Sequence, residues 1–114
     1  MGYTDLVHLD GSIERLVDNN EDAEVDPWEI TNGAAGFNAV SRHVVYAGGV
    51  SKHDGKPLDT RTLEQKKALA DYVRNFHSRF PQIRIVGHNE LNSKKACPSF
   101  DVQEWLRSLG VRQV

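Results

Sequence analysis

The chain has 114 residues, of which 39% are hydrophobic and 26% charged, and its formal net charge is −2. This length and composition are typical of one globular domain, which we expect to span residues 1–114. The absence of long apolar runs excludes a membrane span, the start lacks the pattern of a signal peptide, and the single Cys97 excludes an internal disulfide framework.

Charge is distributed unevenly along the chain. Residues 1–35 carry nine acidic residues and one basic residue, whereas residues 36–114 carry seven acidic and thirteen basic residues. The basic residues are mostly scattered at helical spacing without interleaved aromatic residues, so we interpret them as a solvated helix face. A nucleic-acid or protein-interaction domain is the alternative that this asymmetry leaves open.

The first half of the chain predicts strands and loops. Two β-prone runs, residues 6–9 and 12–17, flank Asp10-Gly11 and predict a hairpin. Apolar and β-branched residues run together within residues 42–47, which Gly48-Gly49 follow, and this predicts a strand in the centre of the sheet. A turn-rich loop is expected over residues 51–59.

The second half predicts two helices around a short strand. Thr62 and Gln65 have the spacing of a capping box, and apolar residues then recur at helical spacing from Leu63 to about Arg79, before Pro81. We expect a short buried strand over 83–86 and a helix over 101–109. The predicted fold class is α/β, with a small mixed β-sheet flanked by helices.

The acidic connector 18–29 has some features of a calcium-binding loop. Oxygen-bearing side chains occupy the positions of EF-hand ligands, namely Asp18, Asn20, Asp22, Glu24, Asp26 and Glu29. However, Ala23 replaces the glycine that the sharp turn requires, and Pro27 is unfavourable within such a loop. We interpret this segment as a solvated acidic loop, with calcium binding as the alternative.

The segment GHNELNSKKACPSFD, residues 87–101, carries the chemistry-bearing residues. His88 follows a predicted strand and Cys97 lies nine residues further on, so a loop could bring an imidazole and a thiolate to one zinc ion. By spacing alone, a loop histidine and a buried structural cysteine are the alternative. Lys95 could stabilise a developing oxyanion near such an ion, or be a solvated loop lysine.

These residues together resemble type 2 N-acetylmuramoyl-L-alanine amidases, the family of phage lysozyme-type amidases and peptidoglycan recognition proteins. The G-H-x-E start and K-A-C-P-S-F-D close of 87–101 resemble the family's zinc segment. Gly2-Tyr3 with LVHLDGSIERLV (6–17), NAVSRHVVYAGG (38–49) and DGKPLDTRTLEQKKAL (54–69) resemble its hairpin, central strand and capped helix. The resemblance therefore covers nearly the whole chain.

The resemblance implies hydrolysis of the amide between N-acetylmuramic acid and L-alanine of peptidoglycan, with Zn2+ as cofactor. It implies that His88 and Cys97 are two of three zinc ligands, that Lys95 is the catalytic lysine and that Tyr3 is the active-site tyrosine. The zinc would polarise the carbonyl and activate its water, Tyr3 would orient or deprotonate that water, and Lys95 would stabilise the oxyanion. Peptidoglycan is the expected partner, with neither nucleic acid nor membrane.

The chain departs from the family pattern at its start. The family's first zinc ligand is a histidine on an opening strand that precedes a helix and the G-Y motif, and we expect this form to be truncated there and impaired in activity. Thr4 stands where the family usually has histidine. The remaining histidines, His8, His43, His53 and His77, are interpreted as structural or solvated, although His43 lies nearest the predicted centre of the sheet.

Three further expectations follow from this interpretation. The alternative function is a non-catalytic peptidoglycan-binding module of the same fold, although such a binder need not keep both His88 and Cys97. A sheet without an opening strand would have an unpaired edge, which favours a homodimer. We expect cytoplasmic synthesis without a signal peptide, followed by release and action on the cell wall.

Overall fold

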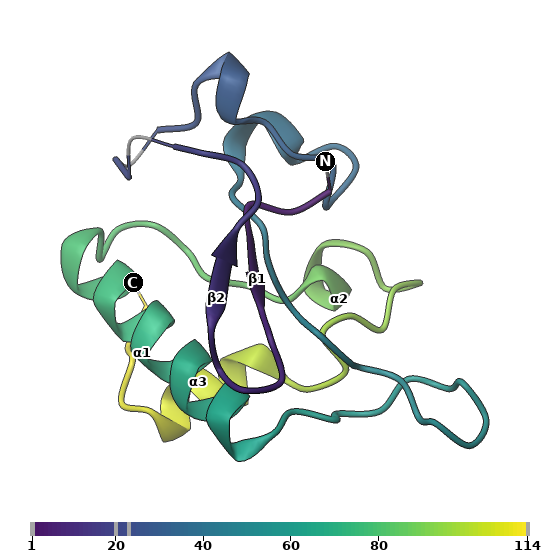
Figure 1. The fold of residues 1–114 in the computed structure, drawn as a ribbon. Helices are drawn as coiled ribbons and strands as arrows, with labels where there is room; N and C mark the ends of the chain where they lie inside the picture. Colours follow the sequence, from purple (N-terminus) through teal and green to yellow (C-terminus); the bar gives the residue numbers. More distant parts are fainter. Residues whose placement is uncertain (1, 20, 23, 114) are drawn as a thin grey trace.

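Three short strands form one mixed sheet in the computed structural model, which describes residues 2–19, 21–22 and 24–113. Strands β1 (Asp5–Val7) and β2 (Ile13–Arg15) form the predicted antiparallel hairpin, with Val7 opposite Ile13. Gly11 has φ +86° in the turn between them, a conformation that glycine adopts without steric cost. The predicted hairpin is therefore confirmed (Figure 1).

Strand β3 (Val44–Tyr46) pairs in parallel with β1, so the strand order is β2-β1-β3. The prediction that this strand is central is wrong for the described residues, because it forms one edge of the sheet. The expected strand over 83–86 is also wrong, since the structure assigns no strand there. Both predictions, the central position of β3 and the strand over 83–86, rested on apolar composition. A strand also needs a neighbouring strand for its backbone hydrogen bonds, and composition does not show which segments are neighbours.

Helix α1 (Leu63–Arg79) has the predicted bounds. The Thr62 side chain accepts a hydrogen bond from the Gln65 backbone, and the Gln65 side chain accepts one from the Thr62 backbone, which completes the capping box. Gln65 is fully buried and donates through Nε2 to the carbonyl oxygens of Val7 and Ala47. The start of α1 is thereby joined to β1 and to the residue that follows β3.

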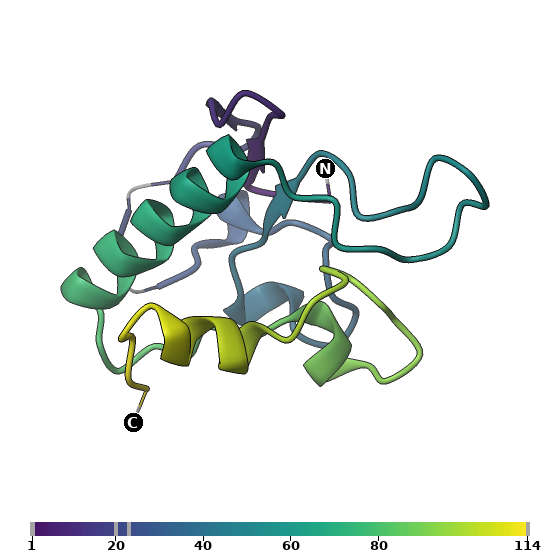
Figure 2. The ribbon, with the colours of Figure 1, turned by 90° about the horizontal axis from the view of Figure 1, so that it is seen from below.

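Helices α2 (His88–Leu91) and α3 (Val102–Ser108) follow in the last third of the chain. The α3 helix confirms the prediction of a C-terminal helix; Asp101 caps it and Gly110 ends it with φ +76°. The short α2 was expected as loop. Figure 2 shows α1 and α3 as separate helical segments, with α2 beyond α3.

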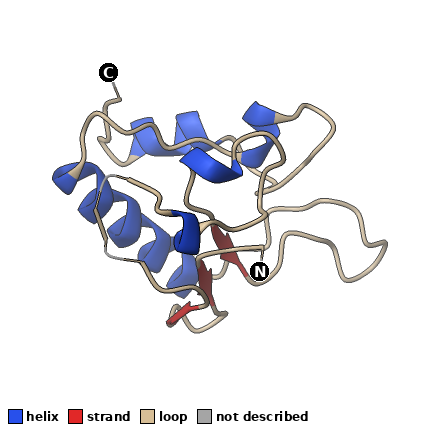
Figure 3. Cartoon of the chain, turned by 90° about the horizontal axis from the view of Figure 1, so that it is seen from above, coloured by secondary structure: helices blue, strands red, loops and turns tan. Residues whose placement is uncertain are grey.

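Two clusters of buried apolar side chains hold these elements together. One joins α1 to α3 and the C-terminal segment, and the other joins α1 to the sheet. Their buried members are Val73, Val102, Leu106 and Val111 in the first and Val7, Tyr46 and Leu69 in the second. The α/β class with helices beside a small mixed sheet is therefore confirmed (Figure 3).

The segment between β3 and α1 extends away from the rest of the molecule (Figures 1 and 2). An isolated antiparallel bridge between Val50 and Pro57 closes this loop. Within the described residues, none of the helices has the length and hydrophobicity needed to cross a bilayer.

Candidate functional site

Three of the four residues predicted for the site line one cavity. Tyr3 precedes β1, His88 is the first residue of α2, and Cys97 ends the loop that follows α2. The cavity has a volume of about 230 Å³ and also borders β3 at Val44. Residues separated by more than 80 positions in the sequence thus meet between β3 and the segment that leads into α2.

Close backbone packing positions the two proposed zinc ligands. The backbone N–H of Asn89 donates to the carbonyl oxygen of Cys97 at 2.9 Å, which ties the start of α2 to the end of the loop. A Cβ atom on Gly87 would lie 2.9 Å from Val102 Cγ2 and 2.6 Å from Asn89 Oδ1. The glycine before His88 therefore allows this turn to approach α3 closely.

A second set of contacts holds the segment after Cys97 against the sheet. The Tyr46 hydroxyl donates to the carbonyl oxygen of Pro98 at 2.7 Å, and the Ser99 hydroxyl donates to the carbonyl oxygen of Gly49 at 2.9 Å. The peptide bond between Cys97 and Pro98 is cis. The position of Cys97 is thus determined by β3 and by the glycine pair that follows it.

The thiol of Cys97 is partly buried, and this burial raises its pKa. Burial disfavours the thiolate, so the metal-free side chain is a protonated thiol at neutral pH. A zinc ion would displace that proton, since the thiolate is the form that binds metal.

Lys95, the fourth predicted residue, lies elsewhere. Its side chain is exposed, and it is not among the residues that line the cavity. Its backbone N–H donates to the carbonyl oxygen of Asn92 in a turn of the loop. Lys95 therefore belongs to the loop that ends at Cys97 but does not line the cavity.

The cavity also contains a histidine that the sequence interpretation did not assign to the site. His43 immediately precedes β3, and its carbonyl oxygen accepts hydrogen bonds from the backbone N–H groups of Thr4 and Asp5. These bonds join the start of β3 to the segment that follows Tyr3, and both His43 and Tyr3 line the cavity. The signal available in the sequence was its position before a strand of the sheet, which by itself does not indicate the direction of a side chain.

The donor atoms around the cavity suit a transition metal, although they are not assembled around one point. Imidazole and thiolate are zinc ligands, and the Nε2 atom of His43 is buried with no hydrogen-bond partner among the described residues. Across residues 2–19, 21–22 and 24–113, no group of three or more His, Cys, Asp or Glu side chains is arranged to hold an ion. The residue types therefore suit zinc.

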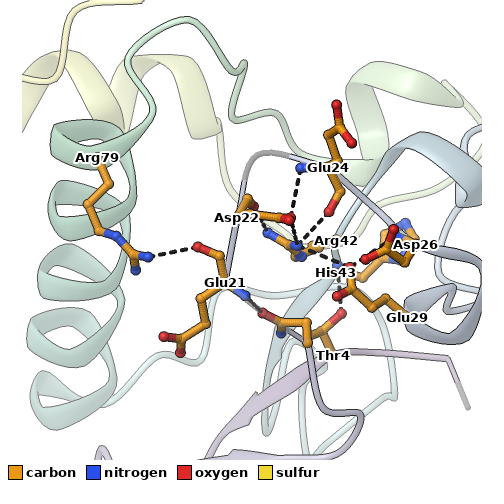
Figure 4. A network of polar contacts seen from close by, with 10 residues as sticks. Thr4, Glu21, Asp22, Glu24, Asp26, Glu29, Arg42, His43 and Arg79 are labelled. Carbon is orange, nitrogen blue, oxygen red and sulfur yellow. Dashed lines mark hydrogen bonds and ion pairs between the residues drawn. The ribbon is translucent and has the colours of Figure 1, made fainter.

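The acidic connector is organised around an arginine (Figure 4). The Arg42 guanidinium donates to the carbonyl oxygens of Asp22 and Glu24 and to the Asp22 and Glu29 carboxylates. Glu29 is 1% exposed, so the interpretation of this segment as wholly solvated is wrong at that residue. Asn20 and Ala23, which bear on the calcium alternative, lie outside the described residues.

The Arg42 contacts argue against the calcium alternative on physical grounds. The guanidinium already occupies carboxylate oxygens that an EF-hand would need as ligands, and its positive charge disfavours a nearby cation. The connector is therefore a structural element whose carboxylates neutralise a mostly buried arginine.

Comparisons with known proteins support the resemblance. No protein-family model matches the chain. An endolysin of Enterobacteria phage K11 is 29% identical over 108 residues, which is 95% of this chain and 65% of that protein. The solved structure of N-acetylmuramoyl-L-alanine amidase LysC from Clostridium intestinale URNW matches with a TM-score of 0.69 at 19% identity, over 97% of this chain and 66% of that one.

The fold is thus the α/β fold of an N-acetylmuramoyl-L-alanine amidase. The sequence match adds similarity to a phage endolysin over nearly the whole chain, which agrees with the resemblance found in the sequence. The chain spans about two thirds of the length of each of these relatives, 65% and 66%.

Proposed function

We propose that the protein hydrolyses the amide bond between the lactyl group of N-acetylmuramic acid and the L-alanine of the peptidoglycan stem peptide. The observation that carries this proposal is the convergence of Tyr3, His88 and Cys97 on one cavity. The similarity to a phage endolysin supports a cell-wall substrate. The protein would act on the wall after synthesis in the cytoplasm and release.

We propose Zn2+ as the cofactor, with His88 and Cys97 among its protein ligands. Zinc bound there would polarise the scissile carbonyl and supply a water whose pKa is near 7. Tyr3, which lines the same cavity, would orient that water through a hydrogen bond with its hydroxyl. A two-ligand site holds zinc weakly, so a further ligand is needed for tight binding.

Lys95 would stabilise the negative charge that develops on the carbonyl oxygen. Its exposed side chain belongs to the loop that ends at Cys97, two residues away, and four methylene groups give it the reach to approach a substrate bound in the cavity. Because it is solvated before substrate binds, its contribution would arise mainly in the transition state.

The direct test is mass spectrometry of purified peptidoglycan digested with the zinc-loaded protein. Amide hydrolysis releases stem peptides with free L-alanine amino termini and leaves glycan strands uncut. We expect this product from the wild type, a loss of about 100-fold or more in Cys97→Ser, and a loss of about 10- to 100-fold in Lys95→Gln. His53→Gln, an exposed histidine outside the cavity, is the matched control.

The same experiment separates the alternative function. A peptidoglycan-binding module would sediment with cell walls in the presence of a chelator and release no L-alanine amino termini. That result, or the appearance of new reducing sugar ends in place of amino termini, would contradict the proposed amide hydrolysis.

A further inference from the structure

A second cavity, larger than the one at His88, lies between strand β2 and helix α1. Its volume is about 530 Å³, against about 230 Å³ for the cavity described above. One wall is the α1 surface from Ala68 to the C-cap residue Phe80, and the other is formed by the hairpin at Ile13 and the connector at Glu21. None of the four residues assigned to amide hydrolysis lines this β2–α1 groove. The groove is therefore a second candidate site with no role in the proposed chemistry.

The charges of the groove walls cancel. Three acidic and three basic residues line the groove, namely Asp5, Glu21, Asp71, Arg15, Arg42 and Arg79. Arg15 pairs with Asp5 at 2.7 Å and with Glu21 at 3.1 Å. Arg79 donates from one wall to the Glu21 carbonyl oxygen on the other (Figure 4). A ligand of high charge, such as a nucleic acid, gains little from walls without net charge, so the groove favours an uncharged ligand.

Two aromatic rings supply the apolar part of the groove. Phe76 and Phe80 lie one turn apart at the end of α1, with ring centroids 5.3 Å apart, and both are only partly buried. The opposite wall adds the side chain of Ile13, which is 44% exposed. Aromatic rings present apolar surface in a rigid shape, and the C–H face of a pyranose ring is a matching surface.

Polar groups that lack partners accompany these rings. The exposed side chains of Asp71 and Asn75 lie one turn apart on α1 and make no hydrogen bond or ion pair with another described residue. On the opposite wall, Asn19 Oδ1 accepts a hydrogen bond from the Glu21 backbone N–H, and the Asn19 amide nitrogen has no acceptor within the described ranges. Carboxylates accept hydrogen bonds and amides both donate and accept them, so together they suit a ligand rich in hydroxyl groups. Hydroxyl groups beside an apolar ring face are the features of an oligosaccharide.

We propose that the β2–α1 groove binds an uncharged stretch of oligosaccharide, which for the proposed function is the glycan strand of peptidoglycan. The identity of this polymer rests on the proposed function, whereas the sugar-binding chemistry rests on the groove alone. Arg42, Tyr72 and Phe76 line both the groove and the cavity at His88, so the two sites are neighbours. A glycan strand held in the groove would keep stem peptides of the same polymer at a high local concentration near the cavity. The groove would thereby assist hydrolysis without contributing a catalytic residue.

The test is a titration of the metal-free, nitrogen-15-labelled protein with tetra-N-acetylchitotetraose, an uncharged tetrasaccharide, followed by nuclear magnetic resonance. We expect the side-chain amide resonances of Asn19 and Asn75 to shift on binding. Asn75→Ala and Asp71→Ala should each weaken the affinity about 5-fold, because each removes one hydrogen-bonding group. Both residues are exposed, so neither substitution removes a side-chain hydrogen bond of the described fold. Ser78→Ala is the matched control, since Ser78 is exposed on α1, does not line the groove and should leave the affinity unchanged.

The inference is overturned if the Asn19 and Asn75 resonances do not respond to millimolar tetrasaccharide, or if Asn75→Ala and Asp71→Ala bind it as the wild type does. It is also overturned if the shifts gather at the cavity around His88 instead of at the groove. The titration uses neither metal nor the stem-peptide amide bond. A chain that binds the tetrasaccharide in the groove and releases no L-alanine amino termini would therefore contradict the proposed function alone. A chain that cleaves the amide without binding the tetrasaccharide would contradict this inference alone.

Discussion

The Tyr72 hydroxyl donates a 2.7 Å hydrogen bond to the Asp5 carboxylate, and this bond joins α1 to β1. Asp5 is 1% exposed, and its other oxygen accepts a 2.7 Å bond from Arg15 Nε on β2. One buried carboxylate therefore connects the central strand of the described sheet to its neighbour and to the longest helix.

This relationship predicts the effect of removing the Tyr72 hydroxyl. Tyr72→Phe should lower the free energy of unfolding by about 2 kcal/mol, because the buried carboxylate loses a donor. Burial and, next, the bond to Asp5 raise the pKa of Tyr72. A folded-state pKa above the unfolded value of about 10 stabilises the protein below that pH, and the stabilisation is lost as pH rises further. Urea unfolding from neutral to alkaline pH should show this loss in the wild type and less of it in Tyr72→Phe; equal slopes would contradict it.

Gln65 gives a second prediction about stability. Its side chain amide donates to the carbonyl oxygens of Val7 and Ala47, at 3.3 and 2.8 Å, from a fully buried position. Gln65→Met keeps a similar volume but removes the donor, and should cost about 2 kcal/mol in denaturant unfolding. The exposed neighbour Lys66→Met should change stability by less than about 0.5 kcal/mol. Similar effects of the two substitutions would refute the role given to the amide.

Arg42 gives a third prediction about stability. Arg42→Met removes a guanidinium whose side chain is 14% exposed and leaves the Glu29 carboxylate, 0% exposed, without that cation. We expect a loss of about 3 kcal/mol in the free energy of unfolding. The control is Arg79→Met. The exposed Arg79 guanidinium donates to the Glu21 carbonyl oxygen, and its removal should lower the free energy of unfolding by less than about 1 kcal/mol. The prediction fails if thermal and urea unfolding rank the two variants in the opposite order.

Gly33 connects packing to the candidate site. Gly33→Ala would place a methyl group 2.5 Å from the His43 ring and 2.8 Å from the Gly2 carbonyl oxygen, so the ring must move. Gly33→Ala should therefore lower the free energy of unfolding by about 2 kcal/mol, because the added methyl group overpacks the cavity wall. Gly2→Ala adds its methyl group to open space and should change stability by less than about 0.5 kcal/mol. Equal stability of the two variants in urea unfolding would show that the wall of the cavity tolerates a side chain at residue 33.

The outer edge of β3 has no partner strand among the described residues, and homodimer formation through this edge stays a prediction. Sedimentation at rising concentration should then show association that Val45→Lys prevents, because lysine on an edge strand opposes pairing. Val40→Lys, at a residue 76% exposed before β3, should leave association unchanged. A monomer at all concentrations would exclude the dimer.

Local sequence patterns determined the elements whose stabilising contacts are near in sequence. The capping box at Thr62 and the apolar periodicity predicted α1 with its observed bounds, and the Asp10-Gly11 turn predicted the hairpin. The motif around His88 and Cys97 likewise indicated both the family and a site, because residue types at a given spacing can be identified in the sequence without knowledge of the fold.

Tertiary structure decided what depends on distant neighbours. Apolar composition could not show that β3 is an edge strand or that residues 83–86 form no strand, because strands pair between residues far apart in the chain. It also could not assign His43 to the cavity. The bonds from Thr4 and Asp5 to its carbonyl, and the contact with Thr31, place its ring there, and only the folded chain brings these residues together.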